Sequence, residues 1–245
     1  MKNFSLLTFS LLLFLGSKSS VFCQIQPEDD YKIQTFKGYR CSTDGIIGFS
    51  YRRGYVIDVG KQQIWGFDIT NIEHEKETRL VHPSTGNSFI LGKALYFFTL
   101  RPEYGVRDRL FRRANKDGIE INWIWSIGPS IGILKPYYIQ YQSLSNYQPF
   151  DPKVHDPQNL FWQNQDVLGS GGFFRGFSRI KLEPGIHGKL SFDLEWGNDF
   201  ENLNSVEAGI MLDVYLHKIL IIPQAENKST YFSIFLCYNL FGQKW

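Results

Sequence analysis

The sequence predicts an all-β protein in which one antiparallel, up-and-down β-barrel crosses a membrane, with eight strands favoured and ten possible. Several segments of about ten residues alternate between apolar and polar side chains. The N-terminus has the order of a secretory leader. No later stretch reaches the run of about 18 apolar residues that is typical of a transmembrane helix. The chain therefore either crosses a membrane as strands or is soluble.

The alternation is clearest in residues 119–127, 186–196, 206–216 and 231–240. Successive side chains of a strand point to opposite faces, so each segment has one apolar face. Segments of about ten residues suit a membrane-crossing strand, whereas strands of soluble proteins are typically about 5–6 residues long. The apolar residues expected to face lipid are Ile121, Trp123, Trp125, Phe192, Leu194, Ile210, Leu212, Ile234 and Leu236.

The polar faces of the same segments carry ionisable residues that we expect to point into the barrel. A barrel of about eight strands fills its interior with side chains, and buried charges must pair, so we interpret this set as mostly structural. The alternative is an acid/base or ligand site, with His187 and Asp193 or Glu195 as the core of a hydrolytic site. No serine motif accompanies these residues, and no catalytic residue is assigned. The predicted lumen set is Glu120, His187, Lys189, Asp193, Glu195, Glu207 and Asp213.

The eight expected strands place both termini on the periplasmic side, because their number is even. Residues 129–130 then form a short periplasmic turn, and residues 142–185 form a long extracellular loop. Residues 73–90 become an unusually long periplasmic connection. Residues 52–54 (RRG) suit a turn, which would raise the count to ten. The expected strands are residues 46–60, 64–72, 91–104, 118–128, 131–141, 186–196, 205–217 and 229–241.

We expect the chain to consist of three parts. Residues 1–23 are a signal peptide with a positive start, an apolar run of about a dozen residues, and small residues before a cleavage site after Cys23. Lipidation of Cys23 is an alternative that the bulky Phe22 disfavours. Residues 24–44 are a periplasmic lead-in, and residues 45–245 form a single barrel domain. Cys41 and Cys237 would remain in the mature chain and could form a disulfide.

The expected long loop carries two further candidate sites. Asp151, His155 and Asp156 offer donors for a divalent cation, but such loops are more often simply solvated, so no metal and no cofactor are assigned. Two aromatic pairs, at residues 161–162 (FW) and 173–174 (FF), either pack over the barrel mouth or mark a partner or glycan surface. The net charge of +2 gives no indication of a nucleic-acid partner.

The chain ends in Phe241-Gly-Gln-Lys-Trp245. This ending resembles the terminal strand that the barrel-assembly machinery recognises, although Gln243 departs from the usual hydrophobic residue. Four internal segments also carry a resemblance, namely residues 53–58, 100–105, 130–136 and 182–189. Together with the chain end, they make the sequence similar to Bacteroidota-type outer-membrane β-barrels of unassigned function. That resemblance implies an outer-membrane location in a Gram-negative cell, with outer-membrane lipid and the assembly machinery as partners, and it implies no activity.

Four functions remain open from the sequence. The favoured one is a structural or interaction barrel, an accessory component of the cell envelope for which an envelope protein complex is a candidate partner. The alternatives are an outer-membrane enzyme acting on lipid or envelope polymer, and a small-ligand channel. The fourth is a soluble secreted β-barrel, which would bury Ile121, Trp123, Phe192 and Leu194 inside.

Overall fold

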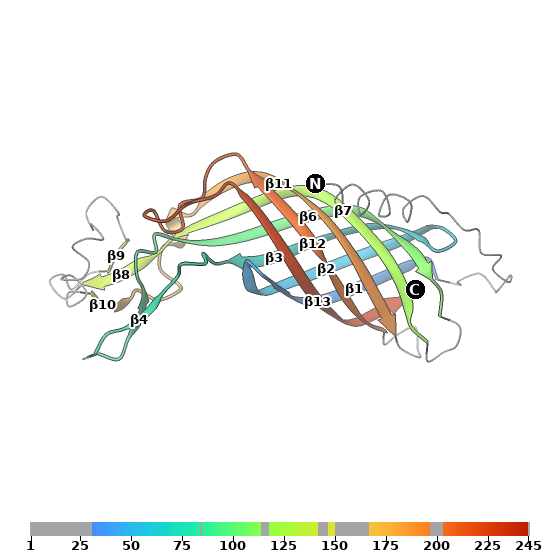
Figure 1. Cartoon of the computed structure of the whole chain (residues 1–245), viewed down its shortest axis with the longest axis horizontal. Helices are drawn as coiled ribbons and strands as arrows, with labels where there is room; N and C mark the ends of the chain where they lie inside the picture. The colour runs from blue at the N-terminus through green and yellow to red at the C-terminus, as the bar shows by residue number, and fades with distance from the viewer. Residues whose placement is uncertain are drawn as a thin grey trace, which may run out of the picture. The chain divides into compact units, whose positions relative to one another are not determined.

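Eight antiparallel strands close into one up-and-down barrel (Figure 1), which confirms the predicted fold class and strand number. The computed structural model describes residues 31–83, 85–113, 118–141, 147–149, 167–196 and 203–244. Each barrel strand pairs with the next one in sequence, and the last pairs with the first. The barrel strands are β1 (Ile33–Ser42), β2 (Gly45–Asp58), β3 (Lys61–Ile72), β6 (Leu95–Phe111), β7 (Glu120–Pro136), β11 (Lys181–Trp196), β12 (Leu203–Tyr215) and β13 (Thr230–Lys244).

Several predicted features lie outside the described residues. The signal peptide at 1–23 is one of them, and so the cleavage site and lipidation at Cys23 stay predictions. The side chain of Phe241 is likewise not described, although its backbone belongs to β13. The other candidate residues from the sequence that lie outside the described part are Asp151, His155, Asp156, Phe161, Trp162 and Trp245.

The first strand was missed by the sequence prediction, which assigned residues 24–44 to a periplasmic lead-in. In the structure, β1 pairs with both β2 and β13 and is needed to close the barrel. Its alternation is irregular, because Lys37 faces outward while Phe36 is buried inside. The barrel therefore begins at Ile33, not at residue 45.

The predicted turn at residues 129–130 is wrong, because β7 runs through it as one strand of 17 residues. Pro129 lacks an N–H group, so it fits a strand only where no ladder hydrogen bond is required of it. The register pairs Leu100 with Ile131 and Tyr104 with Ile127, which places Pro129 opposite Pro102 of β6. The ladder between β6 and β7 is interrupted between those two pairs, where neither proline can donate.

These two errors cancel in the strand count, but they reverse the placement of the three connections between them, at residues 59–60, 73–94 and 112–119. We call the end that holds both ends of the barrel sequence the terminal end, and the opposite end the loop end. The long connection after β3 now lies at the loop end, so the long periplasmic connection expected from the sequence disappears. β2 and β3, β6 and β7, and β11 and β12 are joined at the terminal end, whereas β1 and β2, β3 and β6, β7 and β11, and β12 and β13 are joined at the loop end.

The ten-stranded alternative is wrong, because β2 continues through the Arg-Arg-Gly segment. Arg52 points into the barrel and Arg53 points outward, as expected for neighbours in one strand. The possible disulfide is also absent. Cys237 is buried inside, whereas Cys41 is exposed on the exterior, and both thiols are free.

The exterior of the barrel is mostly apolar. Phe192 is 48% exposed and Ile234 is 57% exposed, while Trp123 packs its ring 4.7 Å from that of Phe192. A soluble barrel would have placed these residues inside, so the arrangement contradicts that alternative. Contact with lipid itself remains a prediction. The structure places all nine predicted lipid-facing residues on the outside, namely Ile121, Trp123, Trp125, Phe192, Leu194, Ile210, Leu212, Ile234 and Leu236.

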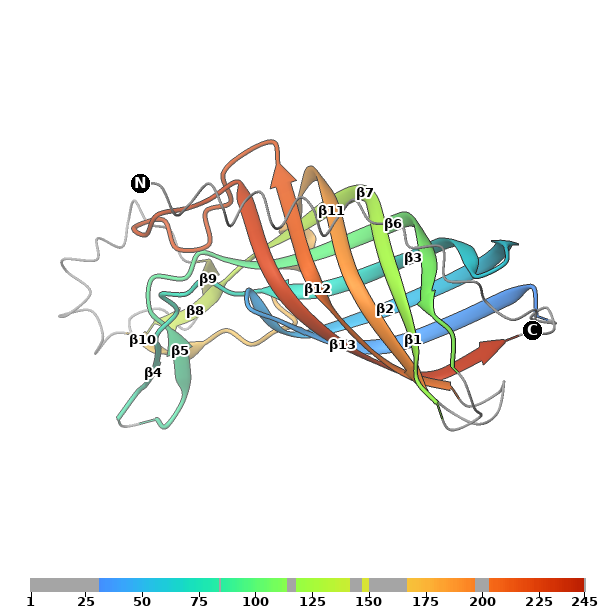
Figure 2. The ribbon, with the colours of Figure 1, turned by 45° about the vertical axis from the view of Figure 1, so that its right-hand side comes forward.

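The remaining elements are short and gather at the loop end (Figures 1 and 2). Across the described residues, no helix is long and apolar enough to span a membrane. These elements are β4 (Arg79–Val81), β5 (Ser88–Ile90), β8 (Tyr138–Tyr141), β9 (Tyr147–Pro149), β10 (Val167–Ser170) and the 3-10 helix η1 (Phe177–Arg179).

Candidate functional site

The barrel interior is lined with charged side chains that interlock across the lumen. All members of the predicted lumen set point inward and are at most 3% exposed. Their cationic partners were not predicted from the sequence, and they come mostly from β2 and β6. The predicted set is Glu120, His187, Lys189, Asp193, Glu195, Glu207 and Asp213, and its principal partners are Arg52, Arg101, Arg107, Arg109, Arg113 and Lys244. Arg40 of β1 joins the network by pairing with Asp68.

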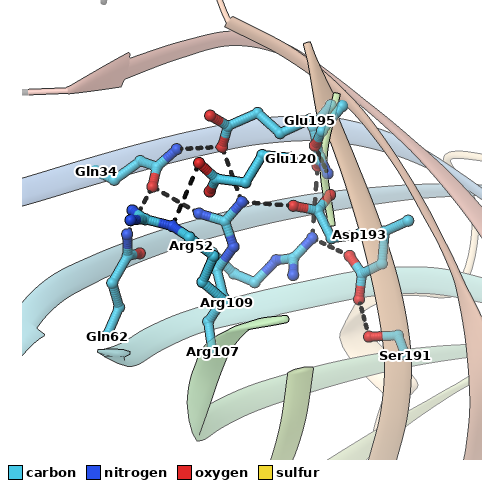
Figure 3. Close-up of polar contacts among 12 residues, drawn as sticks. Gln34, Arg52, Gln62, Arg107, Arg109, Glu120, Ser191, Asp193 and Glu195 are labelled. Atoms are coloured by element: carbon cyan, nitrogen blue, oxygen red, sulfur yellow. Dashed lines mark hydrogen bonds and ion pairs between the residues drawn. The ribbon is translucent and has the colours of Figure 1, made fainter. Parts of the chain in front are cut away.

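Arg107 organises the cluster nearest the terminal end (Figure 3). Its guanidinium donates to Asp193 at 2.7 Å and to Glu195 at 2.8 Å, and it also donates to the side-chain oxygen of Gln34 at 2.6 Å. Glu195 accepts further bonds from Arg113 at 2.7 Å and Lys244 at 2.8 Å. Arg107 of β6 is thereby bonded to residues of both β11 and β1. Glu195 is bonded in addition to Lys244, at the end of β13.

A second cluster occupies the middle of the barrel. Arg40 pairs with Asp68 at 2.7 Å, and Arg52 pairs with Glu207. Lys189 pairs with Glu103 and lies 3.7 Å from Asp68. Three cations and three carboxylates thus share this layer, counting Arg40, Arg52 and Lys189 against Asp68, Glu103 and Glu207.

A third, smaller cluster lies toward the loop end. Arg101 donates three hydrogen bonds to the two carboxylate oxygens of Asp213, at distances from 2.9 to 3.1 Å. Such fork-shaped pairing is the strongest geometry for an arginine and a carboxylate. Ser130 donates to the same carboxylate at 2.7 Å, and Arg101 also donates to Thr70 at 3.2 Å.

The clusters leave little free space between them. The gap lined by Phe36, Arg52, Ile124 and Arg107, among other side chains, has no room for a water molecule. The ring of Phe36 also lies 4.8 Å from the guanidinium of Arg107, so aromatic side chains help to fill the lumen. This packing matches the structural interpretation of the lumen residues.

The hydrolytic alternative does not fit the geometry. His187 and Asp193 lie on the same strand six positions apart, which separates them by roughly 20 Å. Glu195 is farther still, and it is already held by Arg107 and other cations. His187 is 2% exposed, and neither ring nitrogen has a hydrogen-bond partner among the described residues. The proposed pairing of His187 with Asp193 or Glu195 is therefore wrong.

An apolar plug closes the lumen at the loop end. The connection between β12 and β13 turns Ile219, Ile221 and Ile222 inward, where they are 1–6% exposed. These three residues, which we call the mouth plug, pack with Ile72, Phe97, Leu134 and Tyr215 of the barrel wall. Backbone hydrogen bonds hold the plug, from Ala94 N–H to Ile221 and from Ile219 N–H to Lys228.

Beyond the plug, two long connections fold together into what we call the outer β unit. It consists of the β4–β5 hairpin and the three-stranded sheet β10–β8–β9. Its buried core is made by Phe89 from one connection and by Tyr137, Ile139 and Val167 from the other. The unit therefore has a hydrophobic core of its own, distinct from the charged lumen.

Hydrogen bonds between the two connections fix the unit. The Tyr137 hydroxyl accepts from the backbone N–H of Ile90 at 3.0 Å, and Thr85 donates to the carbonyl of Leu168 at 2.9 Å. Burial raises the pKa of the Tyr137 phenol, so the ring stays neutral at ordinary pH. This unit is hard to predict from the sequence, because its strands are only three or four residues long.

A cleft of about 640 Å³ opens beside the plug at the loop end. Its lining mixes carboxylates with lysines, and one pair of them, Glu75 and Lys228, lies 3.7 Å apart. Throughout the part of the chain that the structure describes, no group of three or more His, Cys, Asp or Glu residues is arranged to hold a metal ion. The ionisable lining residues are Asp44, Glu73, His74, Glu75, Lys76, Glu77, Glu226 and Lys228.

Comparison with known proteins gives matches only among solved structures. No family model and no curated protein matches the sequence. The chain is similar to Ail, the attachment invasion locus protein of Yersinia pestis, solved in complex with the heparin analogue sucrose octasulfate. The identity is 8%, over 88% of this chain and 99% of that chain, with a TM-score of 0.41. It is also similar to Neisserial surface protein A, at 10% identity over 90% of this chain and 100% of that chain, with a TM-score of 0.44.

Proposed function

We propose that this chain is a small β-barrel of the bacterial outer membrane that serves as a non-conducting scaffold and presents the outer β unit as an interaction surface of the cell envelope. One observation carries the proposal: the interior is filled by paired charges and closed by an apolar plug, while the exterior is apolar. A solvent-exposed barrel would have the opposite polarity, and a channel would need an open lumen.

The polarity of the wall supports the membrane part of the proposal. A closed barrel pairs every strand with two neighbours, so no strand edge is left to be solvated. Side chains such as Trp125, Leu194 and Leu236 are more than a third exposed on the outside. Lipid would bury the part of these side chains that is still exposed, and each Å² of apolar surface removed from water contributes about 25 cal/mol.

The connection lengths support an orientation. Outer-membrane barrels have short periplasmic turns and longer extracellular loops, with both termini in the periplasm when the strand number is even. The tight turn at residues 59–60 lies at the terminal end, and the two longest connections, 73–94 and 137–180, lie at the loop end. We therefore place the outer β unit outside the cell.

The scaffold role is favoured over a channel because two independent features close the lumen. The ion-pair clusters fill the barrel between its walls, and the mouth plug covers them. The proposed partners are outer-membrane lipid, the barrel-assembly machinery, which would recognise β13 and the C-terminal residues Phe241 and Trp245, and an envelope protein complex. The resemblance to Bacteroidota-type barrels is consistent with these partners.

The first experiment is membrane fractionation combined with a heat-modifiability gel. We expect the protein in the outer-membrane fraction and a faster-migrating band without heating, because a folded barrel resists unfolding by detergent. Recovery in a soluble fraction, or no band shift, would overturn the membrane proposal.

The second experiment measures conductance in planar lipid bilayers. We expect no channel activity from the natural chain, and none from a variant carrying Ile219→Ser, Ile221→Ser and Ile222→Ser, because the ion pairs still fill the lumen. Stable channels in the natural chain would overturn the scaffold role. Channels in the variant alone would show that the plug is the seal and that the ion pairs do not block water and ions.

A further inference from the structure

Residues 171–181, which join the outer β unit to β11, lie against the exterior of the barrel. The Phe173 ring is 6.1 Å from Tyr96 and 6.0 Å from Phe98, two side chains on the outer face of β6. Phe177 is stacked edge-on against Phe173 at 5.8 Å. Phe173 therefore does not pack over the barrel mouth, which was one of the two expectations from the sequence.

Contacts with Lys135 hold this segment against the barrel wall. It is an exterior residue of β7, yet it is only 1% exposed, because the segment covers it. Its ammonium lies 4.1 Å from the ring of Phe173, 4.6 Å from Tyr96 and 4.9 Å from Phe177. It also donates to the backbone carbonyl of Phe173. A lysine that would otherwise meet lipid thus receives carbonyl and aromatic partners.

The other side of the segment is open and has a mixed chemistry. Phe174 is 88% exposed and Phe177 is 49% exposed. The exposed cations Arg179 and Lys181 follow directly in the sequence. Aromatic side chains beside cations are typical of the membrane–water interface, where the rings reach the acyl boundary and the cations reach lipid phosphates.

We propose that residues 171–181 form an aromatic foot that docks the outer β unit onto the lipid surface of the outer leaflet. In this arrangement Phe174 inserts at the acyl boundary, while Arg179 and Lys181 contact headgroup phosphates. Continuity with the apolar wall supports lipid as the occupant, because Phe173 extends the exterior aromatic surface of Tyr96 and Phe98. The inference rests on the proposed membrane location and adds a second lipid contact outside the barrel strands.

The test uses an environment-sensitive fluorophore attached at position 174. Phe174→Cys is prepared in a chain carrying Cys23→Ser and Cys41→Ser, and the buried Cys237 is left unchanged. The barrel is first refolded into vesicles of phosphatidylcholine and phosphatidylglycerol and is then labelled, because Cys237 is protected from the thiol reagent only in the folded barrel. Val81→Cys is the matched control, because Val81 is also apolar and is 62% exposed on β4 of the outer β unit.

We expect blue-shifted emission at position 174 and stronger quenching by a lipid-borne quencher than by iodide, with the reverse at position 81. Adding Arg179→Glu and Lys181→Glu should shift the probe at position 174 toward iodide quenching, since the cations would no longer attract phosphates.

The outcomes separate the two proposals. If the labelled protein shows no heat-modifiable band, the barrel proposal itself fails. If the band shift is present but position 174 is as accessible to iodide as position 81, the aromatic foot is overturned and the membrane barrel stands. If the charge reversals leave the quenching at position 174 unchanged, the headgroup contact is overturned.

Discussion

The barrel interior is filled in two different ways at its two ends. From the terminal end to the level of Asp213, side chains of the strands meet as ion pairs. At the loop end, aliphatic side chains of the β12–β13 connection meet an aromatic wall that includes Phe97 and Tyr215. The first region is built by the alternation of strands, and the second is supplied by a loop.

The two regions differ in how strongly they determine the register of the barrel strands. Ion pairs join walls that are not neighbours in the sheet, as Arg52 of β2 does with Glu207 of β12 and Arg40 of β1 does with Asp68 of β3. Because these pairs connect particular strands across the lumen, we hypothesise that they fix the closed register of the barrel. Apolar packing is less directional and can readjust, so the mouth plug contributes stability with weaker control of register.

The largest effect is expected from breaking one buried pair. Arg101→Met leaves the Asp213 carboxylate buried without its main partner, and we expect a loss of about 3–5 kcal/mol in the free energy of unfolding. Urea-induced unfolding in detergent micelles or vesicles measures this change.

The double variant Arg101→Met and Asp213→Leu is the control. It removes both charges, so it should recover most of the stability that the single variant loses. A single variant that loses less than about 1 kcal/mol would contradict the view that the network fixes the barrel.

A smaller effect is expected in the apolar region. Ile221→Ala creates a cavity in the mouth plug, and we expect a loss of about 2–3 kcal/mol, because the loop can partly relax. Leu220→Ala is the matched control, since its side chain is 50% exposed and the change should cost less than about 0.5 kcal/mol. Equal losses in the two variants would show that the plug does not pack as the structure describes.

The two regions also differ in how far the sequence predicts them. Strict alternation in residues 186–196 and 206–216 is enough to assign Lys189, Asp193 and Glu207 to the lumen face, because each side chain of a strand points to one of two faces. The mouth plug carries no such signal. Its isoleucines lie in a connection, and only the tertiary fold turns them inward.

The strand boundaries show why local pattern was insufficient. β1 was missed because it carries an outward lysine and an inward phenylalanine, so tertiary pairing overrides its weak alternation. The sequence prediction divided β7 into two strands, because proline is common in turns and Pro129 lies in its middle. Only the strand register shows that Pro129 lies opposite Pro102 of β6. The lumen cation Arg40 depends on the first of these corrections, since it belongs to the missed strand.

A smaller loss of stability is expected from a change in the outer β unit. Tyr137→Phe removes the acceptor for the Ile90 N–H, and we expect the unit to lose about 1 kcal/mol of local stability. Limited proteolysis of the membrane-inserted protein should then cut faster within residues 79–90. Unfolding of the whole barrel should not change measurably, and a clear decrease would show that the unit and the lumen are coupled.

The smallest effect is expected from an ion pair on the outside of the barrel. Comparing it with the buried pair of Arg101 and Asp213 shows how burial changes the strength of an ion pair. Lys61 and Asp108 lie 3.6 Å apart on neighbouring strands, with side chains 47% and 38% exposed. Lys61→Ala should change the free energy of unfolding by less than about 0.5 kcal/mol, because water screens both charges. A double-mutant cycle on this pair, set beside the same cycle on Arg101 and Asp213, measures the two coupling energies directly. Equal coupling energies would mean that the low-dielectric lumen adds nothing to the strength of its ion pairs.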